Sequence, residues 1–127
     1  MNIKNFLNTF LTSFDCYEEN NGLVFVLPNK YNYAEKRTSF FITEEANGGF
    51  TISDRGQTLN YLEDEMDVDL AGYSNFINKL CKQYEIKLEN KVFTAHLASF
   101  ETNQTMINLL NFLGAMQTIA NIAVLEN

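Results

Sequence analysis

Hydrophobic positions along the chain repeat with two periods, one typical of helices and the other of strands. The first segment has helical spacing, with apolar side chains at Ile3, Phe6, Leu7, Phe10, Leu11 and Phe14. This spacing predicts an amphipathic helix over residues 3–14. The polar run at residues 18–22 is typical of a turn, so the helix is expected to end near Asp15.

Three short segments after this helix predict strands. Residues 23–27 are continuously apolar, as in a strand buried on both faces, and residues 39–43 and 50–53 are further strand candidates. Residues 46–49, Ala-Asn-Gly-Gly, predict a hairpin because Asn and Gly tolerate a positive φ. Residues 23–54 therefore predict a three-stranded antiparallel meander.

Helical spacing returns after the meander. Two short helices are predicted within residues 58–66 and 76–84, and a second hairpin within residues 86–95. Residues 106–125 are apolar nearly all round, so this last helix must lie at the centre of the fold or against a second copy of the chain. The side chains expected to mediate self-association are Leu109, Phe112, Leu113 and Met116.

The order of these elements predicts an α+β fold. Its sheet is mostly antiparallel, a three-stranded meander plus a hairpin, and it packs with an N-terminal and a C-terminal helix. A length of 127 residues fits a single domain over residues 1–127. A hydrophobic share of 46% is enough to build a real core.

Few residues offer metal or cofactor chemistry. His96 is the only histidine, and Cys16 and Cys81 lack the spacing of metal ligands, so we expect no metal and no cofactor. Ser99 cannot be joined to a catalytic triad by spacing. The chain opens without a secretory pattern, and its longest apolar tract, residues 119–125, is too short to cross a membrane. These features predict a cytoplasmic protein with free thiols and no membrane contact.

The net charge is strongly acidic, −7 at pH 7. Binding to nucleic-acid backbones depends on Lys and Arg, so this charge argues against direct nucleic-acid binding. An acidic balance can serve solubility alone, or it can present carboxylates to a basic partner protein. One acidic run along the chain likewise has two interpretations. It is either a solvated face or a mimic of nucleic-acid phosphates. It contains Glu63, Asp64, Glu65, Asp67 and Asp69.

A second candidate for partner binding is aromatic and basic. Tyr31 and Tyr33 lie in a predicted loop together with Lys30, Lys36 and Arg37. Such residues can stack on and pair with a single nucleic-acid strand, or they can anchor a protein interface. The acidic net charge favours a protein contact.

Residues 49–59 predict a strand, a tight polar turn and the first turn of a helix. Asp54 ends the strand, where its side chain can close the turn and cap the helix. The alternative is a metal-dependent nuclease site, in which Asp54 joins Glu85 and Lys87 of a Glu-x-Lys triplet as catalytic residues. That site requires the two carboxylates to converge on one metal ion.

The turn Ser53-Asp54-Arg55-Gly56-Gln57-Thr58-Leu59 resembles a motif of the DUF1828 family, a bacterial and phage domain of unknown function. Asp54, Gly56, Thr58 and Leu59 match that motif, whereas Arg55 replaces an acidic residue. The resemblance extends over roughly residues 20–125. It implies a phage, prophage or mobile-element setting, with the host cytoplasm as the location, and it implies no particular reaction.

Three functions are compatible with these residues. The first is a small acidic protein that binds a protein partner and forms a homodimer through its last helix. The second is an inhibitor of a host nucleic-acid enzyme or defence nuclease, of the anti-CRISPR or anti-restriction type, that acts by acidic DNA mimicry. The third is a metal-dependent nuclease. The sequence favours the first function.

Overall fold

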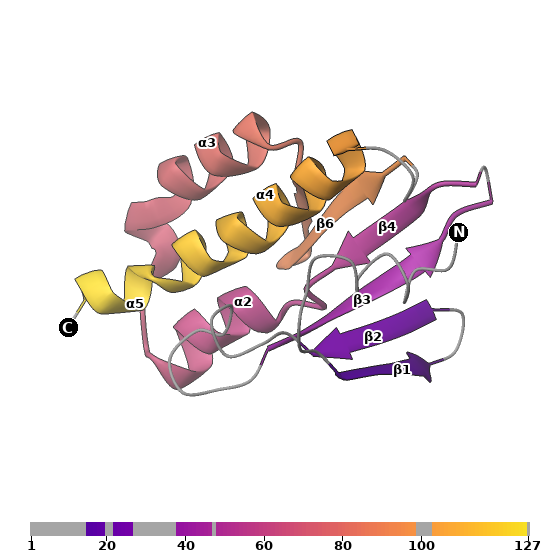
Figure 1. The fold of residues 1–127 in the computed structure, drawn as a ribbon. Coiled ribbons are helices and arrows are strands. Elements are labelled where there is room, and N and C mark those ends of the chain that lie inside the picture. Colours follow the sequence, from indigo (N-terminus) through magenta and orange to yellow (C-terminus); the bar gives the residue numbers. More distant parts are fainter. Residues whose placement is uncertain (1–14, 20–21, 27–37, 47, 99–102, 127) are drawn as a thin grey trace.

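The described part of the chain forms one antiparallel sheet of six strands in a computed structural model (Figure 1). The structure describes residues 15–19, 22–26, 38–46, 48–98 and 103–126. The strands are β1 Asp15–Glu19, β2 Gly22–Val26, β3 Ser39–Glu44, β4 Phe50–Ser53, β5 Lys87–Glu89 and β6 Val92–Leu97. Across the sheet they stand in the order β1-β2-β3-β4-β6-β5.

The predicted α+β class is confirmed, and so are the meander and the hairpin. Strands β2, β3 and β4 form the meander, and β5 and β6 form the hairpin. Pairing of β4 with β6 places Ile52 opposite Ala95 and joins the two units. The sheet is therefore continuous, although the chain leaves it between β4 and β5 to form helices.

Strand β1 corrects one prediction. Glu18 and Glu19 belong to this edge strand and not to a turn, and Cys16 stands opposite Phe25 of β2. Charged residues are common on edge strands because they discourage pairing with other chains. The polar composition that suggested a turn is therefore typical of this position. The predicted helix over residues 3–14 lies outside the described residues.

The two faces of the sheet differ in composition. Buried apolar side chains share one face, namely Phe25, Phe40, Ile42, Ile52, Phe93 and Leu97. The alternate positions of β3, β4 and β6 carry mostly polar side chains that are half-buried or exposed, namely Phe41, Thr43, Thr51, Ser53, Thr94 and His96. We call the surface made by this second set the polar sheet face.

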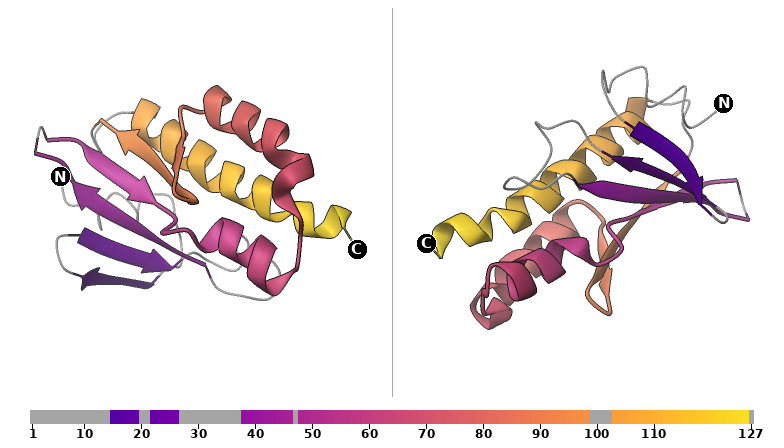
Figure 2. Two further views of the ribbon diagram at one scale, coloured as in Figure 1. Left: turned by 180° about the vertical axis from the view of Figure 1, so that it is seen from behind. Right: turned by 90° about the horizontal axis from the view of Figure 1, so that it is seen from below.

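The helical segments lie between β4 and β5 and after β6 in the chain. They are α2 Gln57–Asn60, the π-helix η2 Tyr61–Glu65, the 3-10 helix η3 Leu70–Tyr73, α3 Ser74–Gln83, α4 Asn103–Ala120 and α5 Ile122–Leu125. Buried residues of α2, α3 and α4 share one core with the apolar face of the sheet. The front and back views both show α4 between α2 and α3 (Figures 1 and 2).

Helix α4 supplies the centre of this core. Leu109, Phe112, Leu113 and Met116 are at most 1% exposed within one chain. The ring of Phe112 meets that of Phe40 edge-on, with 5.8 Å between the ring centroids. The prediction that these four side chains mediate self-association is therefore corrected, because side chains buried in their own core offer no surface to a second copy.

The stretch Asn103–Leu125, which combines α4 and α5, is long and apolar enough to cross a membrane by length and composition alone. Half of it is buried inside the fold. A helix at the centre of a folded domain passes the same test, so this single helix is weak evidence for a membrane span.

Truncation of Phe112 tests the position of α4. We expect Phe112→Ala to lower the free energy of unfolding by about 3 to 5 kcal/mol, because it leaves a cavity between helix and sheet. Leu110→Ala is the matched control, since Leu110 on the same helix is 38% exposed. Urea unfolding of both variants measures the difference. Equal losses in the two variants would contradict the core position of Phe112.

Candidate functional site

The turn that follows β4 reverses the chain within four residues. The backbone N–H of Gln57 donates to the carbonyl of Asp54 at 3.1 Å. Arg55 has φ 54° and Gly56 has φ 82° and ψ 0°. Two successive positive φ values are typical of a type I′ turn, and the second position favours Gly. Helix α2 begins directly after this turn.

The carboxylate of Asp54 accepts three backbone hydrogen bonds. Its Oδ1 accepts from the N–H groups of Gly56 and Phe93, each at 2.9 Å, and its Oδ2 accepts from the N–H of Thr58 at 3.1 Å. The residue is 1% exposed. One side chain therefore closes the turn, caps the first turn of α2 and holds β6. A carboxylate at a helix N-terminus is also stabilised by the helix dipole.

Arg55, where the chain departs from the expected acidic residue, has its own contacts on the polar sheet face. Its guanidinium carbon lies 3.8 Å from the centroid of the Phe41 ring, and one guanidinium nitrogen lies 3.1 Å from a carboxylate oxygen of Glu19. The positive φ of a non-glycine residue is unfavourable. Cation–π contact and ion pairing offset part of that strain and connect the turn to edge strand β1.

The three residues of the hypothetical nuclease site have different surroundings. Both carboxylate oxygens of Asp54 accept backbone N–H groups, and the side chain is buried. Lys87 pairs with Glu89 at 3.0 Å on the surface. Glu85 follows the end of α3 and is exposed. No group of three or more potential metal ligands occurs among the residues that the structure describes.

The acidic run is folded into a defined segment. Glu63 pairs with Lys91 at 3.0 Å, and Asp69 accepts a hydrogen bond from the backbone N–H of Ala71 at 3.0 Å and caps η3. Asp64, Glu65 and Asp67 are exposed. At least two of the five carboxylates therefore stabilise the fold locally.

The other predicted candidates contribute little to a described site. Tyr31 and Tyr33 lie outside the described residues, as does Ser99. Both cysteines are free thiols. Cys81 is 6% exposed, and burial raises the pKa of its thiol, which makes it a poor nucleophile at neutral pH.

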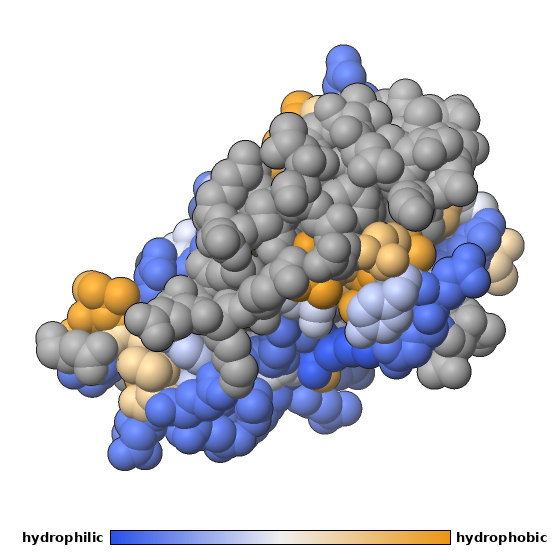
Figure 3. Space-filling view, turned by 60° about the horizontal axis from the view of Figure 1, so that its bottom comes forward, coloured by the Kyte–Doolittle hydropathy of each residue, from blue (hydrophilic) through white to orange (hydrophobic). Residues whose placement is uncertain are grey.

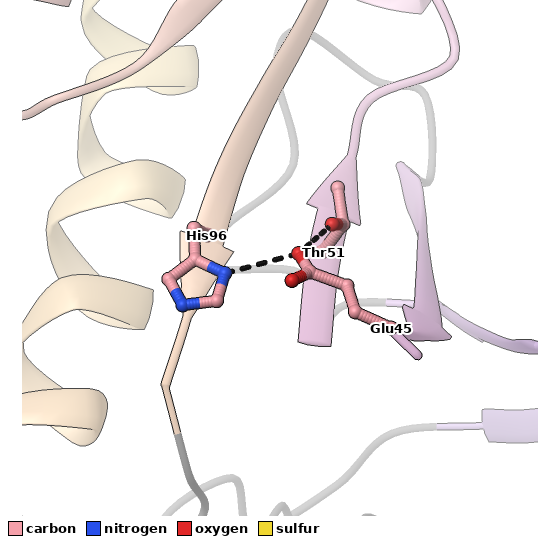
Figure 4. Close-up of polar contacts among 3 residues, drawn as sticks. All are labelled: Glu45, Thr51 and His96. Carbon is pink, nitrogen blue, oxygen red and sulfur yellow. Dashed lines mark hydrogen bonds and ion pairs between the residues drawn. The ribbon is translucent and has the colours of Figure 1, made fainter. Parts of the chain in front are cut away.

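A cluster of three side chains on the polar sheet face was not predicted from the sequence. Glu45 accepts a hydrogen bond from the Thr51 hydroxyl, and its Oε1 lies 3.0 Å from Nδ1 of His96 (Figure 4). Thr51 and His96 stand directly opposite each other on β4 and β6. A Cβ on Gly49 would lie 2.6 Å from the imidazole, so a larger residue there would displace the ring. Pairing of β4 with β6 is what brings these residues together.

The geometry of this cluster defines what it can do. The carboxylate of Glu45 orients the imidazole through Nδ1, and 56% of the His96 side chain is exposed. A carboxylate–histidine pair can exchange a proton or bind a polar ligand. A nucleophile bonded to the imidazole would be needed for triad chemistry. The Thr51 hydroxyl does not serve in this way, because it donates to Glu45.

Comparison with known families places the Asp54 turn in context. The family model of the domain of unknown function DUF1828 matches residues 35–119, which includes the whole turn and most of α4. The chain belongs to the DUF1828 family. The match begins before β3, so β1 and β2 lie outside it. No curated protein and no solved structure matched the chain.

The DUF1828 turn motif therefore coincides with a backbone junction of the fold. Asp54 accepts the hydrogen bonds, and Gly56 supplies the positive φ. Thr58 contributes the N–H that Oδ2 binds, and its buried hydroxyl lies 3.5 Å from the sulfur of Met116 in α4. The matched residues connect strand β4, the turn and helices α2 and α4. This connection is a structural explanation for why these residue types occur together.

Replacement of Asp54 tests whether the motif stabilises this junction. We expect Asp54→Ala to lower the free energy of unfolding by about 3 kcal/mol or more, because three backbone N–H groups lose their acceptor. Asp54→Asn keeps one carbonyl oxygen for Gly56 and Phe93, and we expect it to lose about half as much. Chemical denaturation of both variants measures the losses. A change below about 0.5 kcal/mol for Asp54→Ala would contradict the junction role.

The surroundings of Glu45 predict how the stability of the fold depends on pH. Hydrogen bonds from Thr51 and, second, His96 lower the pKa of Glu45. A group with a lowered pKa stabilises the fold above its unfolded pKa, and the contribution is lost as the pH falls through the folded value. We expect the melting temperature of the wild type to exceed that of Glu45→Gln at about pH 6, and the gap to narrow toward about pH 3. A difference in melting temperature that grows as the pH falls would contradict this stabilising role of Glu45.

Proposed function

We propose that this DUF1828 protein acts by binding a partner protein through its acidic segment, residues 63–69. The observation that carries the proposal is the way the fold fixes this segment. The N–H of Met66 donates to the carbonyl of Tyr61 at 3.0 Å, and the N–H of Val68 donates to the carbonyl of Leu62 at 2.8 Å. Leu62 and Val68 are both buried. The exposed carboxylates between them are therefore held on a short, anchored loop.

The backbone of the segment supports a binding role. Tyr61–Glu65 is a π-helix, a rare conformation that is frequent at functional sites. Asp67 has φ 53°, a left-handed value that Asp adopts more readily than most residues, so the backbone turns sharply here. A loop that is already ordered loses little conformational entropy when it binds. Rigid presentation of Asp64, Glu65 and Asp67 thus favours recognition over a purely solubilising role.

The charge indicates the chemistry of the partner. Three exposed carboxylates on a protein of net charge −7 suit a surface rich in Lys and Arg. On the face shown in Figure 3, hydrophilic residues gather along the lower edge. Electrostatic attraction would speed association and would weaken with added salt.

A more specific candidate is an inhibitor of a host nucleic-acid enzyme or defence nuclease. The nucleic-acid groove of such an enzyme is a basic surface, and carboxylates can occupy the places of phosphates. The phage or mobile-element setting suggested by the family, with action in the host cytoplasm, is compatible with this role. Because Glu63 and Asp69 are engaged within the fold, the mimicry would rest mainly on Asp64 and Asp67.

Neutralisation of the segment tests the proposal. The tagged wild type and an Asp64→Asn/Asp67→Asn variant are used to capture proteins from a bacterial lysate, and the affinity for the captured partner is then measured. We expect about tenfold weaker binding by the variant, equivalent to about 1.4 kcal/mol. Asn tolerates the positive φ of residue 67, so the fold should be retained.

The matched control removes the same charge elsewhere. Glu18→Gln/Glu44→Gln changes two exposed carboxylates on the sheet and should bind like the wild type. Equal weakening by both double variants would show that net charge alone matters. Unchanged binding by the Asp64/Asp67 variant would remove the acidic segment from the interface.

A further inference from the structure

A polar pocket of about 440 Å³ lies between the end of α3 and the first half of α4. Its volume falls within the range of small-molecule sites, about 300 to 1,000 Å³. The pocket is separate from the acidic segment, the Asp54 turn and the Glu45 cluster, none of which contributes to its walls. Its lining consists of Gln83, Tyr84, Glu85, Gln104, Asn108 and Asn111.

The chemistry of the lining is unusual for a protein surface. Four of the six side chains are carboxamides, each of which offers both a donor and an acceptor. Glu85 is the single charged residue among the described residues of the lining, and its carboxylate would repel a phosphate or another anion. Tyr84 is half-buried and adds an aromatic surface. These groups suit an uncharged, planar ligand with several donors and acceptors.

Two of the carboxamides are already oriented. Nε2 of Gln104 donates to Oδ1 of Asn108 at 2.9 Å. This bond directs the carbonyl of Gln104 and the amino group of Asn108 toward other partners. Asn111 lies three residues further along α4, on the same side of the helix. Carboxamides in such positions can form paired hydrogen bonds with the edge of a nucleobase.

Glu85 occupies a backbone position that usually belongs to glycine. It has φ 55° directly after α3, and the N–H of Ile86 donates to the carbonyl of Cys81 at 2.8 Å. This is the hydrogen bond of a Schellman motif, whose left-handed residue is most often Gly. A carboxylate is thus placed at the pocket although glycine would be less strained. Strain of this kind is typical of binding sites.

We propose that this pocket binds the uncharged base of a nucleoside. The carboxamides of Asn108 and Asn111 pair with the edge of the base, and the ring of Tyr84 lies against its face. Glu85 accepts a hydrogen bond from an amino group on the base. Bases that carry an amino group in place of a carbonyl are therefore preferred. This inference is independent of the protein-binding proposal.

Cytidine and uridine form a matched pair of probes, because an amino group in one replaces a carbonyl oxygen in the other. The ¹⁵N-labelled full chain is titrated with each nucleoside, and the side-chain amide signals of Asn108 and Asn111 are followed by NMR. We expect saturable shifts, with cytidine binding more tightly than uridine and cytidine monophosphate more weakly than cytidine. Absence of saturable shifts at these amides would overturn the proposal.

Two variants separate binding from folding. Asn108→Ala should weaken cytidine binding about tenfold, because it removes a hydrogen-bonding partner at a half-buried helix position. Glu85→Gly should abolish the preference for cytidine over uridine and raise the melting temperature, because glycine relieves the strain. Thr118→Ala, on α4 outside the pocket, should bind as the wild type does. Unchanged cytidine binding in both pocket variants would contradict the proposal that the pocket binds a base. A titration with glucose that shifts the side-chain amide signals of Asn108 and Asn111 equally would contradict it too.

Discussion

The buried carboxylate of Asp54 is the interaction on which the rest of the structure depends. The hydrogen bond from Phe93 spans 39 residues of sequence and holds β6 beside the end of β4. The other two bonds fix the turn and the start of α2. Because the meander and the hairpin meet only at the pairing of β4 with β6, this carboxylate stabilises the seam between them. The apolar face that α4 covers is continuous across both units only when that seam is closed.

Backbone strain in the described residues is concentrated around this seam and at the two proposed binding surfaces. Arg55 and Lys91 have positive φ values, and each side chain makes an ion pair, with Glu19 and Glu63 respectively. Lys91 thereby connects the turn of the hairpin to the acidic segment. Asp67 and Glu85 have positive φ values without a comparable ion pair in the described contacts, and they lie at the acidic segment and the polar pocket. Asp adopts this conformation more readily than most residues, whereas for Glu85 it is strained, and such strain is typical of functional positions.

Much of the fold could be predicted because the hydrophobic pattern is strong where a segment has one buried face. The meander, the hairpin and the long last helix were all predicted in this way. The pattern failed at β1, where an edge strand needs little apolar surface, and Glu18 and Glu19 therefore suggested a turn. It also could not decide what covers α4. Both a core helix and a dimer helix are apolar all round, and only the packing of Phe112 against Phe40 separates them.

The sequence by itself determined the α+β class, the family and the location of the Asp54 turn, because these depend on local spacing and on a contiguous motif. Tertiary structure alone decided the role of each polar side chain. Glu45 and His96 are 51 residues apart in the chain, and strand pairing places them in contact. Asp54 could have been a metal ligand or a cap, and the answer depends on Phe93 approaching from another strand. A carboxylate acquires its function from the groups that surround it, and those groups come from distant parts of the chain.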